Sequence, residues 1–184
     1  MLACCIFDSA SVDNCGKLCY YFIKEVKSMS KICCFTGHRD LQHKYELVIS
    51  KTKKIITDLV EKEGVTDFRA GGAMGFDTAA ALAVIALKDK HPEVKLHLII
   101  PYPGHDKYFE EFHKKLFEYT LANADSVTYI QKHYSSSVMR MRNAALVDGA
   151  DMCVSYLLRL SGGTYQTVTM ARKAKIRLIN VAKV

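Results

Sequence analysis

Short runs of apolar residues alternate along the chain with longer stretches whose apolar positions recur every three or four residues. The short runs are typical of buried strands, and the longer spacing is typical of amphipathic helices. The pattern predicts strands over 31–36, 65–70, 94–100, 126–130, 151–157 and 176–181, and helices over 43–63, 74–90, 107–121, 137–148 and 163–174. Strands that alternate with helices predict right-handed β-α-β units and a parallel sheet with helices on both faces.

The first 29 residues differ from this pattern. They show no clear period, and Asp8 and Asp13 interrupt a short apolar run, so they make a poor secretory signal. We expect residues 1–29 to be an N-terminal extension, either an upstream segment or a weakly structured arm, and residues 30–184 to form one α/β domain.

Two glycine-rich turns each follow a predicted strand and precede a predicted helix. One is Arg69-Ala-Gly-Gly-Ala-Met-Gly-Phe-Asp-Thr78, and the other is Ser161-Gly-Gly-Thr-Tyr-Gln-Thr167. Such turns let backbone N–H groups approach an anion, and the helix N-terminus adds roughly half a positive charge there. Neither turn has the G-x-G-x-x-G spacing or the Gly-Lys-Ser/Thr of a P-loop. They predict a phosphate or nucleotide site of no standard class.

Other polar loops follow strands of the same sheet. They are Thr36-Gly-His-Arg-Asp40, Pro101-Tyr-Pro-Gly-His-Asp106, and His133-Tyr-Ser-Ser-Ser137, which leads into Met139-Arg-Met-Arg-Asn143. Parallel strands bring their carboxyl ends to one edge, where open α/β sheets bind ligands. The loops therefore predict a polar pocket at that edge.

Composition and residue spacing narrow the classes of protein and of site further. The net charge of +7 lies within residues 30–184, either as a solvated lysine surface or as attraction for an anionic ligand or nucleic acid. No apolar run approaches the ~20 residues that span a membrane. The seven cysteines include no C-x-x-C pair, which favours reduced thiols in a cytoplasmic protein. The histidines at 97, 105 and 113 lack metal-ligand spacing, so no metal is expected.

Four segments resemble the SLOG superfamily, which includes the DNA-processing protein A family and the LOG cytokinin-activating phosphoribohydrolases. They are Thr36-Gly-His-Arg, Gly71-Gly-Ala-Met-Gly-Phe-Asp-Thr, Arg142-Asn-Ala-Ala-Leu-Val-Asp148 and Gly162-Gly-Thr-x-x-Thr. The resemblance covers about residues 31–181 and is closest to small, single-domain bacterial and phage-borne members, which have no established catalytic activity. It implies a Rossmann-like three-layer α/β/α sandwich with a mostly parallel sheet of about six strands.

The resemblance also implies where a ligand binds. A nucleoside monophosphate, NAD or an ADP-ribose-like molecule would bind at the strand ends, with Gly71, Gly72 and Gly75 in the first phosphate-facing turn. The implied contact residues are Thr36, Gly37, His38, Arg39, Gly71, Gly72, Ala73, Met74, Gly75, Asp77, Arg142, Asn143, Gly162, Gly163 and Thr164.

Several of these residues have a second interpretation. The glycines could serve only as tight turns. Asp77 could cap backbone N–H groups, hold a loop or touch a ribose hydroxyl. Arg142 could grip a phosphate or form a structural ion pair with Asp148. His38 could contact the ligand or brace its loop.

The chain departs from the LOG enzymes at the second turn. Those enzymes carry Pro-Gly-Gly-x-Gly-Thr-x-x-Glu, and the Glu takes part in cleaving the N-glycosidic bond. Here no Pro precedes the glycines and Val168-Thr-Met170 offers no carboxylate. Cleavage develops positive charge on the ribose, so a nearby carboxylate such as Asp77 or Asp148 would have to substitute.

Three functions therefore remain open. The leading one is binding of a nucleotide without turnover. Exposed helix faces would allow either a monomer or a homodimer. The second is a LOG-like phosphoribohydrolase, and the missing Glu counts against it. The third is single-stranded DNA binding, which the charge favours and the lack of an aromatic-basic stripe opposes.

Overall fold

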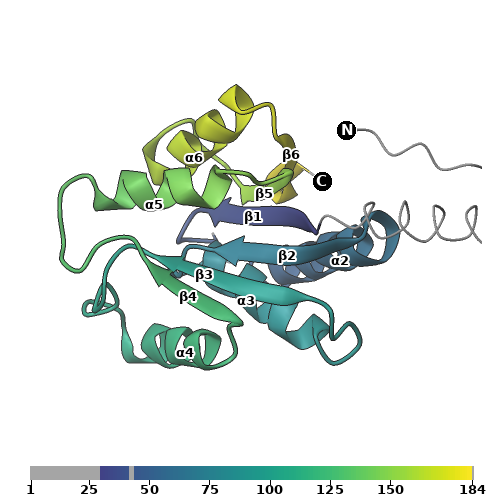
Figure 1. Ribbon diagram of the computed structural model, residues 1–184, viewed down its shortest axis with the longest axis horizontal. Coiled ribbons are helices and arrows are strands. Elements are labelled where there is room, and N and C mark those ends of the chain that lie inside the picture. The colour runs from purple at the N-terminus through teal and green to yellow at the C-terminus, as the bar shows by residue number, and fades with distance from the viewer. Residues whose placement is uncertain (1–29, 42–43, 184) are drawn as a thin grey trace, which may run out of the picture. The chain divides into compact units, whose positions relative to one another are not determined.

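Strands and helices alternate from Lys31 to Lys183 in the computed structural model, which describes residues 30–41 and 44–183 (Figure 1). The elements are β1 (Lys31–Gly37), α2 (Tyr45–Glu63), β2 (Val65–Ala70), α3 (Phe76–Leu87), β3 (Lys95–Ile100), α4 (Glu111–Ala122), β4 (Ser126–Tyr129), α5 (Val138–Val147), β5 (Met152–Tyr156), α6 (Gly162–Lys173), β6 (Arg177–Asn180) and the short 3-10 helix η1 (Val181–Lys183). The predicted extension, residues 1–29, lies outside the described residues.

The six strands form one sheet in the order β4-β3-β2-β1-β5-β6, and every pairing is parallel. Helices α2, α3 and α4 cover one face, and α5 and α6 cover the other (Figure 1). The predicted Rossmann-like three-layer α/β/α fold is confirmed.

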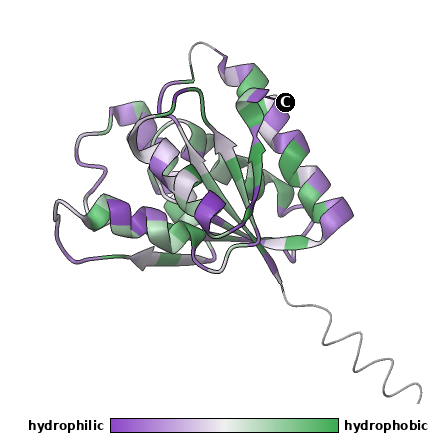
Figure 2. Ribbon diagram, turned by 90° about the horizontal axis from the view of Figure 1, so that it is seen from above, coloured by the Kyte–Doolittle hydropathy of each residue, from purple (hydrophilic) through white to green (hydrophobic). Residues whose placement is uncertain are grey.

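Apolar side chains fill the space between the sheet and each helical layer. The larger core contains Phe35 and Phe68 of neighbouring strands, whose rings stack with centroids 5.7 Å apart. The smaller core contains Cys34 and Cys153, which are register partners in β1 and β5. Both are buried free thiols. Apolar colour gathers on the strands and polar colour on the outer helix faces (Figure 2).

Element boundaries differ from the predicted ones by a few residues. Helix α4 begins at Glu111 and not at 107, because residues 101–108 form turns that include Gly104 with φ 79°. Helix α3 begins at Phe76, directly after Gly75 with φ 78°. A positive φ is incompatible with continuing a right-handed helix, so Gly75 sets the start of α3. The start of α4 is set by Glu110, whose backbone is extended (φ −63°, ψ 152°).

The strand order reverses direction at β1. The chain moves outward from β1 through β2, β3 and β4, and then returns to place β5 on the other side of β1. The loops after β1 and β5 therefore leave the sheet in opposite directions and open a crevice between them. This is the ligand-binding position of open α/β sheets.

Candidate functional site

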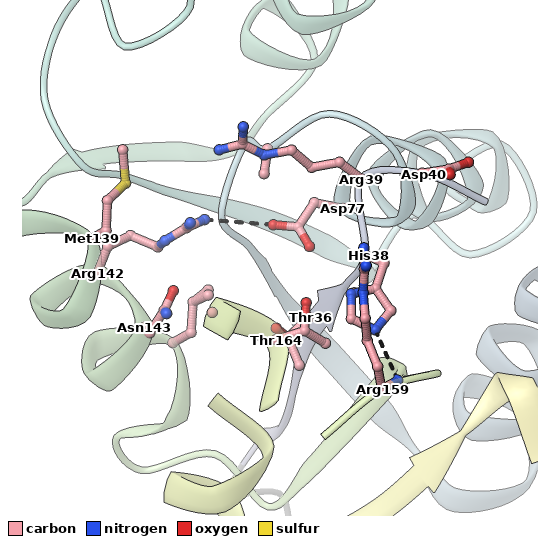
Figure 3. Close-up of a pocket in the computed structure, with 14 residues that line it drawn as sticks. Thr36, His38, Arg39, Asp40, Asp77, Met139, Arg142, Asn143, Arg159 and Thr164 are labelled. Carbon is pink, nitrogen blue, oxygen red and sulfur yellow. Dashed lines mark hydrogen bonds and ion pairs between the residues drawn. The ribbon is translucent and has the colours of Figure 1, made fainter. Parts of the chain in front are cut away.

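A pocket of about 380 Å³ lies at this reversal point, at the carboxyl ends of β1 and β5 (Figure 3). Its volume falls in the range of small-molecule sites. The lining residues are Thr36, Gly37, His38, Arg39 and Asp40 after β1, Ala73 and Asp77 around the start of α3, Met139, Arg142, Asn143 and Leu146 of α5, and Arg159, Gly163 and Thr164 around the start of α6.

The Arg142 side chain enters the pocket from α5 and is only 12% exposed. Its Nη1 donates a hydrogen bond of 2.7 Å to the carbonyl oxygen of Gly71 and lies 3.5 Å from Asp77 Oδ2. Burial lowers the pKa of Arg142, and Asp77 opposes this shift. Nε is buried and has no hydrogen-bond partner among the described residues. The predicted alternative, an ion pair with Asp148, is not the one that forms: the partner is Asp77.

Asp77 lies in the first turn of α3 and is 4% exposed. Burial raises its pKa to about 6, although Arg142 and hydrogen bonds from the backbone of Ala73 and Gly71 act in the opposite direction. Desolvation of a carboxylate outweighs these partners here. Of the three roles predicted for Asp77, holding the loop is the one that these backbone hydrogen bonds support directly. The carboxyl group also lines the pocket.

The glycines of the first turn are tightly packed against neighbouring residues, which leave no room for a side chain. A Cβ on Gly71 would lie 1.7 Å from Arg142 Nη1, and a Cβ on Gly75 would lie 2.1 Å from the backbone oxygen of Arg39. A Cβ on Gly72 would meet Ile100 at 2.5 Å. Gly71, Gly72, Met74 and Gly75 are not among the lining residues, whereas Ala73 and Asp77 are. The turn therefore has packing reasons for its glycines and serves to hold Arg142.

The second turn is open. A Cβ on Gly162 (φ 80°) would meet nothing within 4 Å, and one on Gly163 would meet only Asn143 Nδ2, at 3.8 Å. Ser161 precedes α6 without a side-chain hydrogen bond to the helix. Gly163 and Thr164 line the pocket, and Gly162 does not. The first turn of α6 thus presents backbone N–H groups that no described side chain caps.

His38 lines the pocket and also braces its loop. Its ring lines the pocket, and its Nε2 accepts a hydrogen bond of 3.4 Å from the backbone N–H of Arg159 (Figure 3). Its backbone N–H donates to Tyr156, and its backbone oxygen accepts from Phe76. Burial, and then Arg159, lower the pKa of His38. The neutral ring braces the loop that carries Arg159.

Four lining residues are absent from the predicted contact residues: Asp40, Met139, Leu146 and Arg159. Asp40 and Met139 lie in loops that were expected to form the pocket, and Leu146 and Arg159 do not. Arg159 interrupts the run Leu157-Leu-Arg-Leu160, and this break was the available signal. His105, for which no metal was expected, lies with Nε2 2.9 Å from the carbonyl oxygen of Gly72. No group of three or more His, Cys, Asp or Glu side chains within residues 30–41 and 44–183 is arranged to hold a metal.

Residues 31–177 match the model of the YspA SLOG family. The chain belongs to the YspA SLOG family. A relative is the SPbeta prophage-derived protein YoqJ of Bacillus subtilis, which is 27% identical over 135 residues, covering 67% of this chain and 79% of that protein. The predicted membership in the SLOG superfamily is confirmed.

Two solved structures share the fold of this SLOG domain. DNA processing protein A from Streptococcus pneumoniae superposes with a TM-score of 0.59 at 19% identity, over 81% of this chain and 49% of that one. DNA processing protein A from Helicobacter pylori, solved for its single-stranded DNA binding mode, gives a TM-score of 0.54 at 16% identity, over 80% of this chain and 63% of that one. The SLOG chain thus spans about half the length of the first protein. Among the described residues, no helix is long and apolar enough to cross a membrane.

Proposed function

We propose that this SLOG domain binds a nucleotide or a nucleotide-derived ligand in the pocket between β1 and β5. The observation that carries the proposal is the meeting of an uncapped helix N-terminus with a buried arginine. The first turn of α6 at Gly163 and Thr164 and the guanidinium of Arg142 line the same 380 Å³ space. Helix N-termini and arginine are two of the commonest protein partners of phosphate.

The charge around the pocket favours an anion. Three arginines line it, Arg39, Arg142 and Arg159, against two carboxyl groups. One of the two carboxyl groups, Asp77, lies 3.5 Å from Arg142 Nη1, so its negative charge is already compensated by that arginine. A phosphate at α6 would gain from the remaining arginines and from Arg142 Nε.

The rest of the lining fits a ribose or a base. Thr36, Asn143 and Thr164 are each less than 9% exposed and line the pocket, so their polar groups are desolvated. Hydroxyl and amide groups both donate and accept hydrogen bonds, which suits ribose hydroxyls and base edges. The lining therefore combines positively charged groups that favour an anion with neutral polar groups that suit a ribose or a base.

The test is thermal unfolding of the full chain with nucleoside monophosphates, NAD, ADP-ribose, cyclic nucleotides and a short DNA strand. A ligand at about 100 times its Kd adds roughly 2.7 kcal/mol of stability, which raises the midpoint by about 5–10 °C for a domain of this size. Arg142→Ala should abolish the ligand-induced rise. Arg140→Ala is the matched control, because Arg140 is exposed and does not line this pocket.

Arg142→Ala also leaves Asp77 buried without its partner, so each variant is compared with its own ligand-free midpoint. Arg142→Lys provides a second check, since it keeps the charge and loses the planar fork. A rise with DNA alone that disappears at high salt would contradict the proposal and support single-stranded DNA binding. If a nucleotide raised the unfolding midpoint of Arg142→Ala as much as that of the unmodified chain, the nucleotide would not bind in this pocket.

One observation favours a second function, hydrolysis of a nucleoside phosphate. Asp77 is a buried pocket carboxyl with a pKa of about 6, which suits a group that holds or moves a proton near neutral pH. Asp148, the other carboxyl considered from the sequence, is exposed and does not line the pocket. Chromatography of the same incubations for free base, with Asp77→Asn as the inactive variant, separates turnover from binding.

A further inference from the structure

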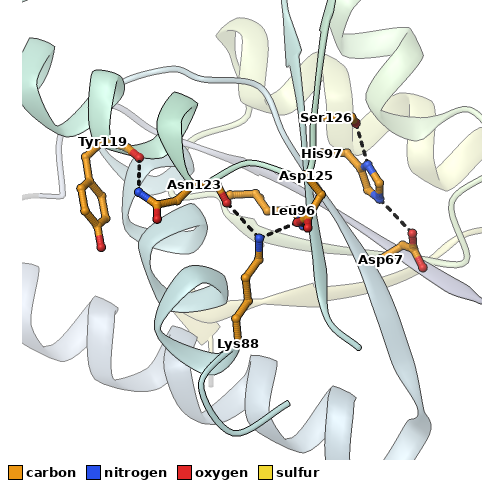
Figure 4. A network of polar contacts seen from close by, with 8 residues as sticks. All are labelled: Asp67, Lys88, Leu96, His97, Tyr119, Asn123, Asp125 and Ser126. Carbon is orange, nitrogen blue, oxygen red and sulfur yellow. Dashed lines mark hydrogen bonds and ion pairs between the residues drawn. The ribbon is translucent and has the colours of Figure 1, made fainter. Parts of the chain in front are cut away.

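A second group of polar side chains lies on the sheet away from the pocket. His97 of β3 sits between Ser126 of β4 and Asp67 of β2 (Figure 4). His97 Nδ1 is 2.7 Å from Ser126 Oγ, and His97 Nε2 is 2.8 Å from Asp67 Oδ1. None of the three residues is part of the pocket lining.

The strand register brings these residues together. His97 is the register partner of Ser126, and Asp67 is paired with Lys95, two residues before His97 on the same face of β3. This is the face covered by α5 and α6, which pack mainly on β1, β3, β5 and β6. All four residues of β4 are exposed. A molecule in solution can therefore reach Ser126.

The hydrogen bonds give each group a defined role. Asp67 Oδ2 accepts a hydrogen bond of 2.7 Å from Thr66 Oγ1, so the carboxylate is oriented independently of His97. A carboxylate only accepts hydrogen bonds, so Nε2 of the neutral His97 ring carries the proton that it donates to Asp67. Nδ1 is then the basic nitrogen, and it faces the Ser126 hydroxyl.

We propose that Ser126, His97 and Asp67 form a nucleophilic triad in which Ser126 accepts an acyl group from an activated ester. A nucleophile and a base within about 2.6–3.2 Å, with the base oriented by a third group, are the signature of an activated serine. Such a constellation is defined by geometry and roles and not by chain order. The site is separate from the proposed nucleotide pocket and does not depend on it.

The reaction balances without a cofactor. Ser126 Oγ forms a bond to the ester carbonyl carbon while its proton passes to His97 Nδ1. The bond from that carbon to the leaving alcohol or phenol then breaks, and the leaving oxygen takes the proton from His97. Water repeats the sequence at the acyl-serine and releases a carboxylic acid. Asp67 stabilises the His97 cation that forms in each step.

The test uses the full chain and a fluorophosphonate, which reacts with activated serines. Intact-mass analysis and peptide mapping should find one adduct, on Ser126. Ser126→Ala should abolish it, and Ser137→Ala is the matched control, because Ser137 is exposed and lies outside the triad. His97→Gln, which keeps a polar side chain but removes the base, should slow labelling by about 100-fold or more.

Asp67→Asn should also slow labelling, because the amide no longer fixes the ring tautomer. Circular dichroism confirms that each variant is folded, and release of nitrophenol from p-nitrophenyl acetate gives a second readout. Absence of an adduct on Ser126, while a known serine hydrolase in the same mixture is fully labelled, would overturn the proposal. Equal labelling of His97→Gln and the unmodified chain would do the same.

Discussion

At the scale of single residues, the contact between Asp77 and Arg142 determines the character of the pocket. Both side chains are nearly buried, and burial shifts the pKa of each toward its neutral form. Breaking such a pair leaves one charge buried without compensation, which costs several kcal/mol. The pair is a fixed part of the pocket wall, and its polar atoms line the pocket.

This contact has a consequence for stability against pH. The pKa of Asp77 is about 6 in the folded chain and 3.8 for the free carboxyl. The folded state thus holds its proton where the unfolded state has lost it. Proton binding by Asp77 therefore adds to the free energy of unfolding. This contribution is fully present below pH ~4 and is lost as the pH rises through 6. The difference of about two pKa units corresponds to roughly 3 kcal/mol.

Urea unfolding of the full chain between pH 4 and 7 measures this loss. The asparagine of Asp77→Asn does not titrate, so the free energy of unfolding of this variant should lack the pH-dependent contribution of Asp77. The difference in free energy of unfolding between the unmodified chain and Asp77→Asn should therefore change by about 2–3 kcal/mol between pH 4 and 7. Parallel curves for the two proteins would show that Asp77 titrates in the folded state as it does in the unfolded one.

At the scale of elements, the turn before α3 is closed by contact with the loop after β1. Gly75 has φ 78°, and a Cβ there would lie 2.1 Å from the backbone oxygen of Arg39. The two loops that flank the pocket are thus packed backbone to backbone. A side chain at position 75 would push them apart and change the shape of the pocket.

Gly75→Ala should therefore destabilise the fold far more than Gly104→Ala. Gly104 has φ 79°, and a Cβ there would meet nothing within 4 Å. Gly104→Ala reports only the cost of a left-handed backbone, about 1–2 kcal/mol. Gly75→Ala should cost at least about 2 kcal/mol more, because backbone must move. Equal unfolding midpoints for the two variants would show that the loops separate freely.

The alternation of elements could be predicted because each strand and helix carries its own apolar period. The pocket was predictable in outline for a related reason, since parallel strands send their following loops to one edge. The role of Gly71 was not predictable, because it depends on an arginine 71 positions away in α5. Arg159 was missed because the break that it makes in a leucine-rich run marks a polar position but does not show which way the side chain points.

At the scale of the whole molecule, the two proposed sites lie in different structural surroundings within the sheet. The pocket lies where the strand order reverses and is enclosed by loops from both halves of the sheet. The Ser126 triad lies toward the β4 edge, where the strand is short and exposed. Ligand binding at one site should leave the backbone of the other unchanged.

Hydrogen exchange tests this separation. A nucleotide that raises the unfolding midpoint should slow exchange in peptides covering 36–40, 71–77 and 157–164. Exchange in β4, residues 126–129, should stay the same beyond any effect of global stabilisation. Slower exchange confined to β4 would place the nucleotide at the wrong end of the sheet and contradict the proposed pocket.

The contact between Arg142 and Gly71 also constrains how this domain can diverge. The guanidinium occupies the position that a side chain at 71 would need, with only 1.7 Å between Nη1 and the added carbon. A substitution at 71 alone would expel the arginine, and loss of the arginine alone would expose a bare carbonyl and a buried carboxyl. Related sequences should therefore keep both residues or replace both, so substitutions at the two positions should be correlated.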